Sequence, residues 1–395
     1  MKRFIIYISI ISIIGLYSCV EPFNPDLPES ASEILVVEGA ITDSEGPYRV
    51  IFSKSTNLET EEIAYVSGIE VSIEEENGKT IALKEVETGI FETNDGDLNG
   101  EPGKSYRLNF FYNEEQYQSD WQLLSASPPI DSIYFRKEIK GTTDKDINIP
   151  GIQFFVDTHG EVDGARYYRW EWEEAWEIGV NYAAFYEYLG NDETELLEQP
   201  KNLCYQDDIS QTINLNTSQN LSENVISQHK IPFVNNDFER LSRKYSLLVR
   251  QYVMEEEEYL FWKNLQESNE ALGSLYDKQP ARVIGNVKNI TNPNTPVLGY
   301  FSANGVVSER VYVPRKDVPI GIVFPIRCEL DTIMKGGDQA ETDKEVFDAL
   351  GFGGIFWEFL YSDLGPGVAG YLISNSRCSD CVSKGGYLEK PDFWE

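Results

Sequence analysis

GIEVSIEEENGKTIAL, at residues 68–83, is the stretch that decides the fold class. Its apolar side chains alternate with polar ones on both sides of a central Asn-Gly pair, with Val71 and Ile73 before the pair and Ile81 and Leu83 after it. Alternation with a period of two is typical of a half-buried strand, and Asn-Gly between two such runs is a signal for a hairpin turn. The stretch therefore predicts two antiparallel strands with one face in a core.

Short runs of the same kind surround this hairpin, such as ILVVEGAIT before it and KSYRLNFFYN after it. Several short strands separated by turn residues predict an all-β sandwich, which we expect to be immunoglobulin-like. The segment SASPPID at 125–131 interrupts the pattern with two prolines, as a domain boundary would. We therefore place a first domain at 34–127 and a second at 128–395.

The second domain also opens with strand patterns. In ARYYRWEWEEAWEI, the side chains of Tyr168, Trp170 and Trp172 share one face while charged side chains share the other. We interpret the aromatic face as sheet core, because aromatic residues are enriched in strands. An exposed contact surface is the alternative.

A helix is predicted at 254–272, where apolar side chains recur at helical spacing. Four glutamates, 255 to 258, fall in its first turn, where carboxylates oppose the positive end of the helix dipole. Thr342 and Glu345 have the spacing of a capping box and predict a shorter helix after them. The fold class is thus mainly β, with an N-terminal sandwich followed by a larger β-rich domain that has a few helices.

The N-terminus reads MKRFIIYISIISIIGLYSC, in which two basic residues precede an apolar run that ends at Cys19. This order is typical of a secretory signal, and Leu-Tyr-Ser-Cys at its end resembles the lipobox of bacterial lipoproteins. We predict a signal peptide at 1–18 and lipidation of Cys19. An ordinary signal peptide with an incidental cysteine is the alternative. The following acidic, proline-rich segment at 19–33 is interpreted as a tether.

The chain carries 66 acidic and 33 basic residues, a formal net charge of −33. Polyanions would be repelled by such a surface, so we expect no nucleic-acid partner. The acid excess itself is interpreted as a solubility feature. Hydrophobic residues make up 41% of the chain, which is enough for a core divided between two domains.

Four cysteines remain after lipidation: Cys204, Cys328, Cys378 and Cys381. An even number in an oxidising compartment predicts two disulfides. A zinc site is the alternative, because the C-terminal pair, Cys-Ser-Asp-Cys, has ligand spacing. A thioredoxin-like redox pair is disfavoured, because this motif lies in an irregular, glycine-rich tail.

The tail from about Tyr371 to Glu395 lacks a long periodic run and needs an anchor. We expect Cys378 and Cys381 to bond to different partners and so to fix this tail on the second domain, because longer disulfide loops remove more unfolded-state entropy. Phe393 is expected to add an apolar attachment together with its neighbour Trp394.

Two loops resemble ligand motifs only in part. Asp95 to Gly100 matches the first half of an EF-hand loop, but the twelfth position is Tyr106, so a solvated loop is predicted and adventitious calcium is the alternative. The next residues, GEPGKS, lack the first glycine of a phosphate loop, whose place is taken by Leu98. We therefore predict no metal site and no cofactor.

Catalytic motifs are also missing from the sequence. His159 and His229 are the two histidines, and their sequence neighbourhoods suggest no partner. Paired carboxylates across a cleft, as in glycoside hydrolysis, stay open as a possibility, but no pair is singled out. We expect a protein that is not an enzyme.

Several separated motifs resemble one family, the uncharacterised lipoproteins of Bacteroidota catalogued as domain of unknown function 4249. The motifs are the lipobox followed by EPF, LVVEGAITDSEGPYRVIFSKS, YSLLVRQY, EYLFWKNL, QPARVIGNVKN, VLGYFSA, CSDC and the terminal KPDFWE. The resemblance implies an outer-membrane lipoprotein, commonly encoded near TonB-dependent transporters, with no established catalytic activity and no family active site.

Together these observations favour a lipid-anchored accessory or substrate-binding protein of the outer membrane, exposed at the cell surface, which works with a TonB-dependent transporter. A structural or envelope-assembly component of an outer-membrane complex is the alternative, and a hydrolase comes third. The leaflet that carries the anchor stays open, because Glu21 is the single acid within the first few residues after Cys19.

Overall fold

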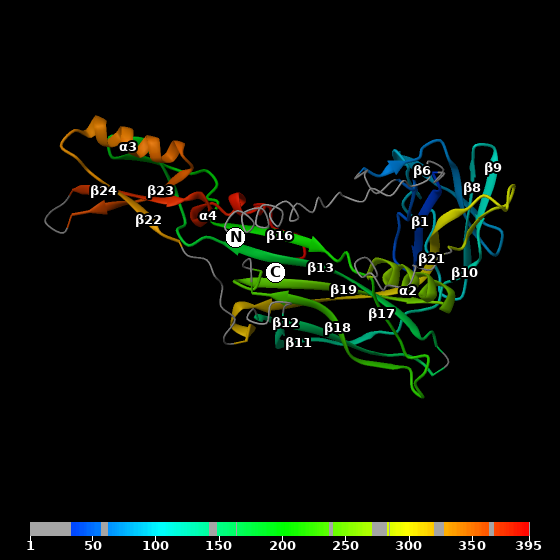
Figure 1. Cartoon of the computed structure of the whole chain (residues 1–395). Helices are drawn as coiled ribbons and strands as arrows, with labels where there is room; N and C mark the ends of the chain where they lie inside the picture. Colours follow the sequence, from blue (N-terminus) through cyan, green and yellow to red (C-terminus); the bar gives the residue numbers. More distant parts are fainter. Residues whose placement is uncertain are drawn as a thin grey trace, which may run out of the picture.

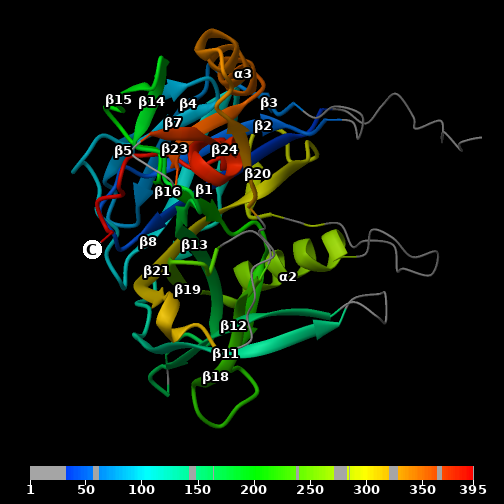
Figure 2. The same ribbon diagram turned by 90° about the vertical axis from the view of Figure 1, so that its left-hand side faces the viewer.

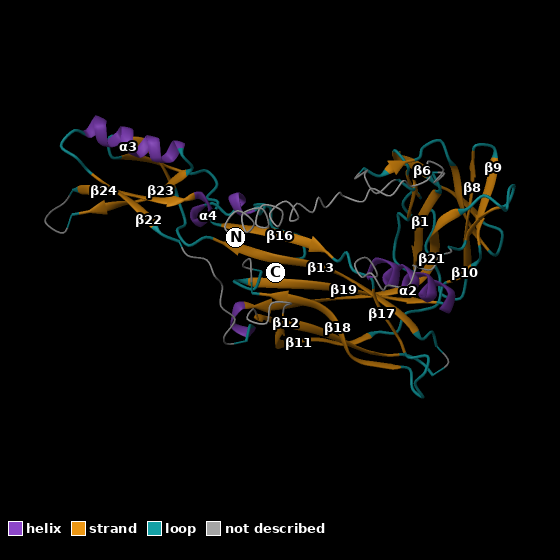
Figure 3. Cartoon of the chain, viewed as in Figure 1, coloured by secondary structure: helices purple, strands orange, loops and turns teal. Residues whose placement is uncertain are grey.

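The computed structural model describes residues 33–56, 62–141, 148–162, 164–236, 240–270, 283, 285–319, 328–362 and 367–394. The predicted signal peptide at 1–18, Cys19 and the tether up to residue 32 lie outside these residues. Strands dominate the described part, with a few helices, so the predicted mainly-β class is confirmed (Figure 3).

The N-terminal sandwich is built from two sheets that face each other. One contains β1 (Leu35–Thr42), β2 (Arg49–Lys54), β3 (Ala64–Tyr65), β6 (Lys84–Glu87) and β7 (Ile90–Glu92). The other contains β4 (Glu70–Glu75), β5 (Thr80–Ala82), β8 (Ser105–Tyr112), β9 (Glu115–Ser119), β10 (Gln122–Leu123) and β20 (Val287–Asn289). Phe52 of the first sheet meets Phe110 of the second edge to face, with ring centroids 4.9 Å apart.

The predicted hairpin at 68–83 is present as β4 and β5. Val71, Ile73, Ile81 and Leu83 are all buried in the sandwich core, as their alternation predicts. Gly78 has a φ of 94°, a left-handed conformation that glycine adopts without steric cost.

Strand β21 (Val297–Pro314) connects the sandwich to the rest of the molecule. Its first half pairs in parallel with β1, from Val297 opposite Leu35, and its second half pairs antiparallel with β19 (Lys244–Met254). The core of the sandwich also includes Val287 and Phe301, which a boundary at residue 127 leaves out. One ten-stranded sheet therefore runs from the sandwich into the second unit (Figure 1).

In the second unit, β13 (Tyr167–Gly179), β16 (Leu203–Ile209) and β17 (Asn214–Thr217) extend this long sheet beside β19. A three-stranded sheet of β11 (Ile130–Gly141), β12 (Asn148–His159) and β18 (Val225–Asn235) forms a second layer below it (Figure 2). Between the layers lie Tyr168, Trp170 and Trp172. The interpretation of these aromatic side chains as sheet core is confirmed, so they offer no contact surface.

Helix α2 (Glu256–Glu270) follows β19 and packs against β13, β17 and β21. It confirms the helix predicted at 254–272, whose last two residues lie outside the described part. The four glutamates do not share one role, however. Glu258 is buried, and its carboxylate accepts hydrogen bonds from Ser302 Oγ at 2.8 Å and Asn304 Nδ2 at 2.7 Å. This side chain fixes the helix to β21 rather than facing solvent.

The C-terminal part forms a small unit at the end of the long sheet opposite the sandwich (Figure 1). We call it the distal module: strands β22 (Leu330–Met334), β23 (Gly354–Tyr361) and β24 (Val368–Asn375), helix α3 (Gln339–Gly351), and the hairpin β14 (Tyr186–Gly190) and β15 (Glu193–Leu196). The described residues also include the short helices η1 (Arg315–Asp317), α4 (Ser376–Ser379) and η2 (Val382–Lys384).

Helix α3 starts earlier than the sequence predicted. Asp338 is its N-cap, and the side chain accepts a hydrogen bond from Ala340 N at 2.9 Å. Thr342 lies inside the helix, where its Oγ1 accepts from Gly336 N and donates to the carbonyl of Asp338. The capping-box prediction was therefore wrong by one turn, because the side chain that caps the first turn is Asp338 and not Thr342.

Candidate functional site

Two disulfides attach the C-terminal tail. Cys204 of β16 is bonded to Cys381, and Cys328 is bonded to Cys378 of α4. The tail pair is thus split between two partners, which is the arrangement that loop length favours. All four cysteines are used in these bonds, so they do not form a zinc site.

The residues around these bonds pack the tail onto the long sheet. Trp394 is buried against Ala175 and Tyr205, and its Nε1 donates to Glu177 Oε1 at 2.8 Å. The Phe393 ring lies 3.6 Å from the guanidinium carbon of Arg310, measured to the ring centroid. Both aromatic side chains attach the tail as predicted.

The tip of the β14–β15 hairpin is held by polar contacts with the rest of the distal module. Asn191 and Asp192 have φ angles of 52° and 62°, which are typical of a two-residue hairpin turn. Asp343 of α3 accepts hydrogen bonds from Asn191 N and from the Tyr188 hydroxyl. Asp192 accepts one from the Tyr371 hydroxyl at 2.5 Å and pairs with a lysine that follows β22, Lys335.

These contacts shift the pKa values of the groups involved. Burial and then the carboxylate of Asp343 raise the pKa of the Tyr188 phenol, so this hydroxyl stays protonated. Burial opposes ionisation of Asp192, but hydrogen bonds from Lys335 and Tyr371 outweigh it and hold the pKa of that carboxyl below its usual range. The tip is therefore a fixed network of two tyrosines, two carboxylates and an ammonium group.

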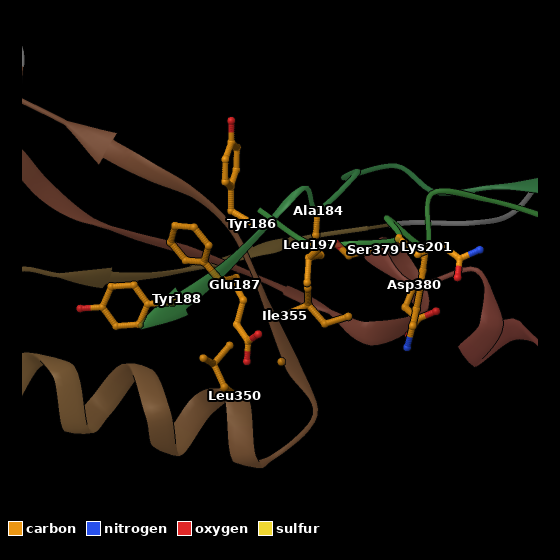
Figure 4. Close-up of a pocket in the computed structure, with 13 residues that line it drawn as sticks. Ala184, Tyr186, Glu187, Tyr188, Leu197, Lys201, Leu350, Ile355, Ser379 and Asp380 are labelled. Carbon is orange, nitrogen blue, oxygen red and sulfur yellow. The ribbon is translucent and has the colours of Figure 1, made fainter. Parts of the chain in front are cut away.

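A cavity of about 330 Å³ lies at the base of the hairpin, where it meets the end of α3, the start of β23 and α4 (Figure 4). The apolar side chains of its wall come from the hairpin segment, from α3 and from β23. The lining residues are Ala184, Tyr186, Glu187, Tyr188, Leu197, Gln199, Lys201, Leu350, Gly354, Ile355, Phe356, Ser379 and Asp380.

Polar groups stand on two sides of this cavity. Lys201, Ser379 and Asp380 lie on one side, and Glu187 lies near Leu350 on the other (Figure 4). Lys201 Nζ and Asp380 Oδ2 are 3.2 Å apart and form an ion pair. Ser379 is 2% exposed, and its Oγ has no hydrogen-bond partner among the described residues. The cavity thus combines an apolar wall with a buried, unused hydroxyl.

Sequence reasoning placed no ligand at this cavity. Its residues come from two parts of the chain that are more than a hundred positions apart, and apart from Ser379 and Asp380 none belongs to a recognisable motif. The one feature of the sequence that could have pointed to this cavity was Ser379, which lies between the two cysteines of the tail motif.

The two histidines have partners that their sequence neighbourhoods did not suggest. His159 Nδ1 lies 2.7 Å from an oxygen of Asp131, and His229 Nε2 lies 2.6 Å from Asn214 Oδ1. Burial lowers the pKa of His229 to about 4. Both partners come from other strands, which is why the sequence neighbourhoods of the histidines did not indicate them.

The loop that resembles half of an EF-hand connects β7 to β8. Asn94 Nδ2 donates to Asp97 Oδ2 at 2.5 Å, and the side chain of Leu98 is buried in the sandwich core. The Gly100 amide donates to the Tyr48 hydroxyl at 2.9 Å. Within the part of the chain that the structure describes, no group of three or more histidine, cysteine, aspartate or glutamate side chains is placed to hold a metal ion.

None of the described helices has the length and apolar character needed to cross a membrane.

Comparison with known proteins identifies one family. The family described as "Domain of unknown function (DUF4249)" matches residues 20–310, whereas no curated protein and no solved structure matches the chain. The matched range includes the sandwich, the β14–β15 hairpin and the long sheet up to residue 310, within β21. It ends before β22, so the rest of the distal module and the terminal motifs CSDC and KPDFWE lie beyond it. Because the match covers well over half of the chain, the protein belongs to the DUF4249 family.

Proposed function

We propose that this protein is a lipid-anchored binding protein of the outer membrane, which works beside a TonB-dependent transporter and has no catalytic role of its own. The lipobox-like end of the signal sequence and the resemblance to outer-membrane lipoproteins support the anchor. Loss of labelled palmitate from a Cys19→Ser variant tests it. Retention of the label would show that Cys19 is not the anchor.

The proposed binding role rests on the surface of the distal module. Exposed large apolar side chains are numerous on this unit, and exposed apolar surface marks interaction sites where such side chains adjoin. They are Phe185, Tyr186, Leu189, Leu196, Met334, Phe347, Phe352 and Tyr361. Phe352 is the most exposed of them at 94%. We infer that this surface contacts the partner protein, because the module stands at the end of the molecule away from the sandwich (Figure 1).

Co-purification of the tagged full-length protein in mild detergent tests the partnership. We expect a TonB-dependent transporter to be recovered with the native chain and to be lost with Phe352→Asp, because a carboxylate cannot be buried in an apolar contact. Ile63→Asp is the matched control, since Ile63 is 62% exposed but lies on the sandwich. Repeated purification of the native protein alone would refute the partnership.

Growth of a deletion strain then separates uptake from envelope assembly, since both roles involve protein partners. A growth defect confined to one nutrient supports the binding role in uptake. A general envelope defect, such as sensitivity to detergent on every nutrient, contradicts it.

A further inference from the structure

We propose that the cavity at the base of the β14–β15 hairpin is a binding site for a molecule or chain end that combines an apolar group with a protonated amine. This inference deepens the proposed binding role and rests on it, because it names the chemistry of the ligand. It makes no use of the transporter, so the two can be tested separately.

The size and walls of the cavity suit one apolar group. Its volume of about 330 Å³ lies at the lower end of the range for ligand sites, which are mostly apolar with a few placed polar groups. The apolar wall includes Leu197 of the hairpin segment, Leu350 of α3, and Ile355 and Phe356 of β23. An aromatic or branched aliphatic group therefore has partners on several sides.

Ser379 supplies the second, independent observation. Ser379 lines the cavity, and its hydroxyl is buried and has no hydrogen-bond partner among the described residues. Buried polar groups are nearly always paired in folded proteins, so an unused hydroxyl in a cavity wall indicates a ligand atom that completes it. The backbone at Ser379 is held in place, because its neighbour Cys378 and the nearby Cys381 are both held by disulfides.

The charges around the cavity favour a cation. Three charged side chains line the cavity among the described residues. Lys201 and Asp380 neutralise each other in an ion pair, whereas the Glu187 side chain has no hydrogen bond or ion pair to any described residue. Leu350 lies in the last turn of α3, and the carbonyl groups at a helix C-terminus carry partial negative charge. An amine bound between Glu187 and this helix end would be stabilised by both.

The same ligand chemistry has two sources. One is a free amine such as an amino-acid derivative, and the other is the N-terminus of a peptide.

Calorimetric titration of the full-length protein in detergent, corrected for a detergent blank, tests both sources with three probes. Phenylalaninamide carries the ring and the amine, hydrocinnamamide carries the ring without the amine, and the tripeptide Phe-Ala-Ala carries both on a chain. We expect phenylalaninamide to bind about tenfold more tightly than hydrocinnamamide, and the tripeptide to bind more tightly still if chain ends are the ligand.

Two variants connect the binding to the cavity. Ser379→Ala is expected to weaken phenylalaninamide binding about fivefold, as loss of one hydrogen bond does. Glu187→Gln should remove most of the preference for the amine without changing hydrocinnamamide binding. Ser374→Ala and Glu358→Gln are matched controls, because Ser374 is buried in the same module and Glu358 is on the same strand as Ile355, but neither lines the cavity.

The proposal is overturned if none of the probes binds, if both ring compounds bind equally, or if Ser379→Ala and Glu187→Gln behave like their controls. Thermal melting of each variant shows that it is folded. Recovery of a transporter is measured on the native chain and on the Phe352→Asp and Ile63→Asp variants, which leave every cavity residue unchanged. Absence of probe binding therefore leaves that result unaffected, and absence of a transporter leaves the titration unaffected.

Discussion

His229 illustrates how neighbours from other segments decide the chemistry of one side chain. Its ring packs against Trp170 with 4.3 Å between centroids and a tilt of 32°, and its two nitrogens lie at hydrogen-bond distance from Asn214 and Asn216. Asn216 donates to Nδ1 through its amide nitrogen, so Nε2 carries the proton that Asn214 Oδ1 accepts. This arrangement suits the neutral ring and leaves no acceptor for a second proton.

The first prediction follows from the lowered pKa of His229, about 4 against the usual 6.5. Between these values the unfolded chain binds a proton that the folded chain does not, so stability falls as the pH is lowered through this window. The loss is expected to reach about 2 kcal/mol between about pH 7 and about pH 5. Urea denaturation of the native chain and of His229→Gln checks it, since the pH dependence should be smaller by this amount in the variant.

Proton NMR provides an internal comparison, because the chain has two histidines. The hydrogen bond with Asp131, and then the charge of that carboxylate, raise the pKa of His159 above its usual value. One ring signal should therefore titrate well below pH 6.5 and the other above it. Two signals that titrate together would contradict the described environment of His229.

At the scale of elements, helix α2 depends on one buried carboxylate. Glu258 accepts hydrogen bonds from Ser302, Asn304 and Trp262, the last through Nε1 at 3.1 Å. Ser302 and Asn304 belong to the half of β21 that pairs with β1. The helix is therefore attached at the point where the long sheet enters the sandwich.

The second prediction concerns Glu258→Ala. It leaves several buried donors without an acceptor, and each unsatisfied group costs about 1–3 kcal/mol, so we expect a loss of at least about 3 kcal/mol in the free energy of unfolding. Glu257→Ala is the control, because Glu257 is exposed in the same turn and such changes stay within about 0.5 kcal/mol. Equal midpoints of urea denaturation for the two variants would show that the buried contacts contribute nothing.

The distal module depends on the bond between Cys328 and Cys378, which closes a loop of 50 residues around β22, α3, β23 and β24. The core of this module is small and consists of side chains such as Tyr188, Val346 and Phe356. A small core benefits most from a covalent constraint on the unfolded chain. The second disulfide instead closes a separation of 177 residues and joins the tail to β16.

The third prediction compares the two disulfides. The double variant Cys328→Ala, Cys378→Ala loses about 4 kcal/mol by the chain-entropy estimate, so the module should be cut by protease within 328–378 while the sandwich stays intact. Removal of Cys204 and Cys381 should release Trp394 from the long sheet, which is seen as a change in tryptophan fluorescence. It should not make the distal module sensitive to protease. Cleavage of both variants at the same sites would mean that the bonds do not act on separate elements.

At the scale of the whole molecule, the sandwich and the long sheet are one continuous structure. β21 supplies a parallel partner for β1 and an antiparallel partner for β19. Gly299 lies opposite Val37 in the half of β21 that pairs with β1, with a φ of 98°, and a Cβ there would lie 1.8 Å from the carbonyl oxygen of Val37. The close approach of the two backbones explains why glycine is required.

The fourth prediction tests this continuity. A fragment of residues 34–127 is expected not to fold alone. It lacks β20, it lacks β21, which is the parallel partner of β1, and it lacks the core side chains Val287 and Phe301. Joining residues 285–304 to its end through a flexible linker should restore a folded sandwich. Dispersed amide signals in NMR spectra report folding, and a well-folded 34–127 fragment would refute the dependence.

The sequence by itself determined the local structure of this protein. Alternation and Asn-Gly in 68–83 gave the hairpin, the aromatic face of β13 indicated a core strand, and helical spacing located α2. These features depend on contacts between near neighbours, whose pattern is written directly in the residue order. The split disulfides were also predictable, since their number and loop lengths follow from the cysteine positions.

Only the tertiary structure decided where distant segments meet. It placed 297–304 beside β1, buried Glu258 while leaving Glu257 exposed, paired both histidines, and formed the cavity from the hairpin and the tail. Such contacts join residues up to hundreds of positions apart, and nothing in the local pattern records which ones meet. The candidate site therefore could not be read from the sequence, because its cavity exists only after the hairpin packs against α3, β23 and α4.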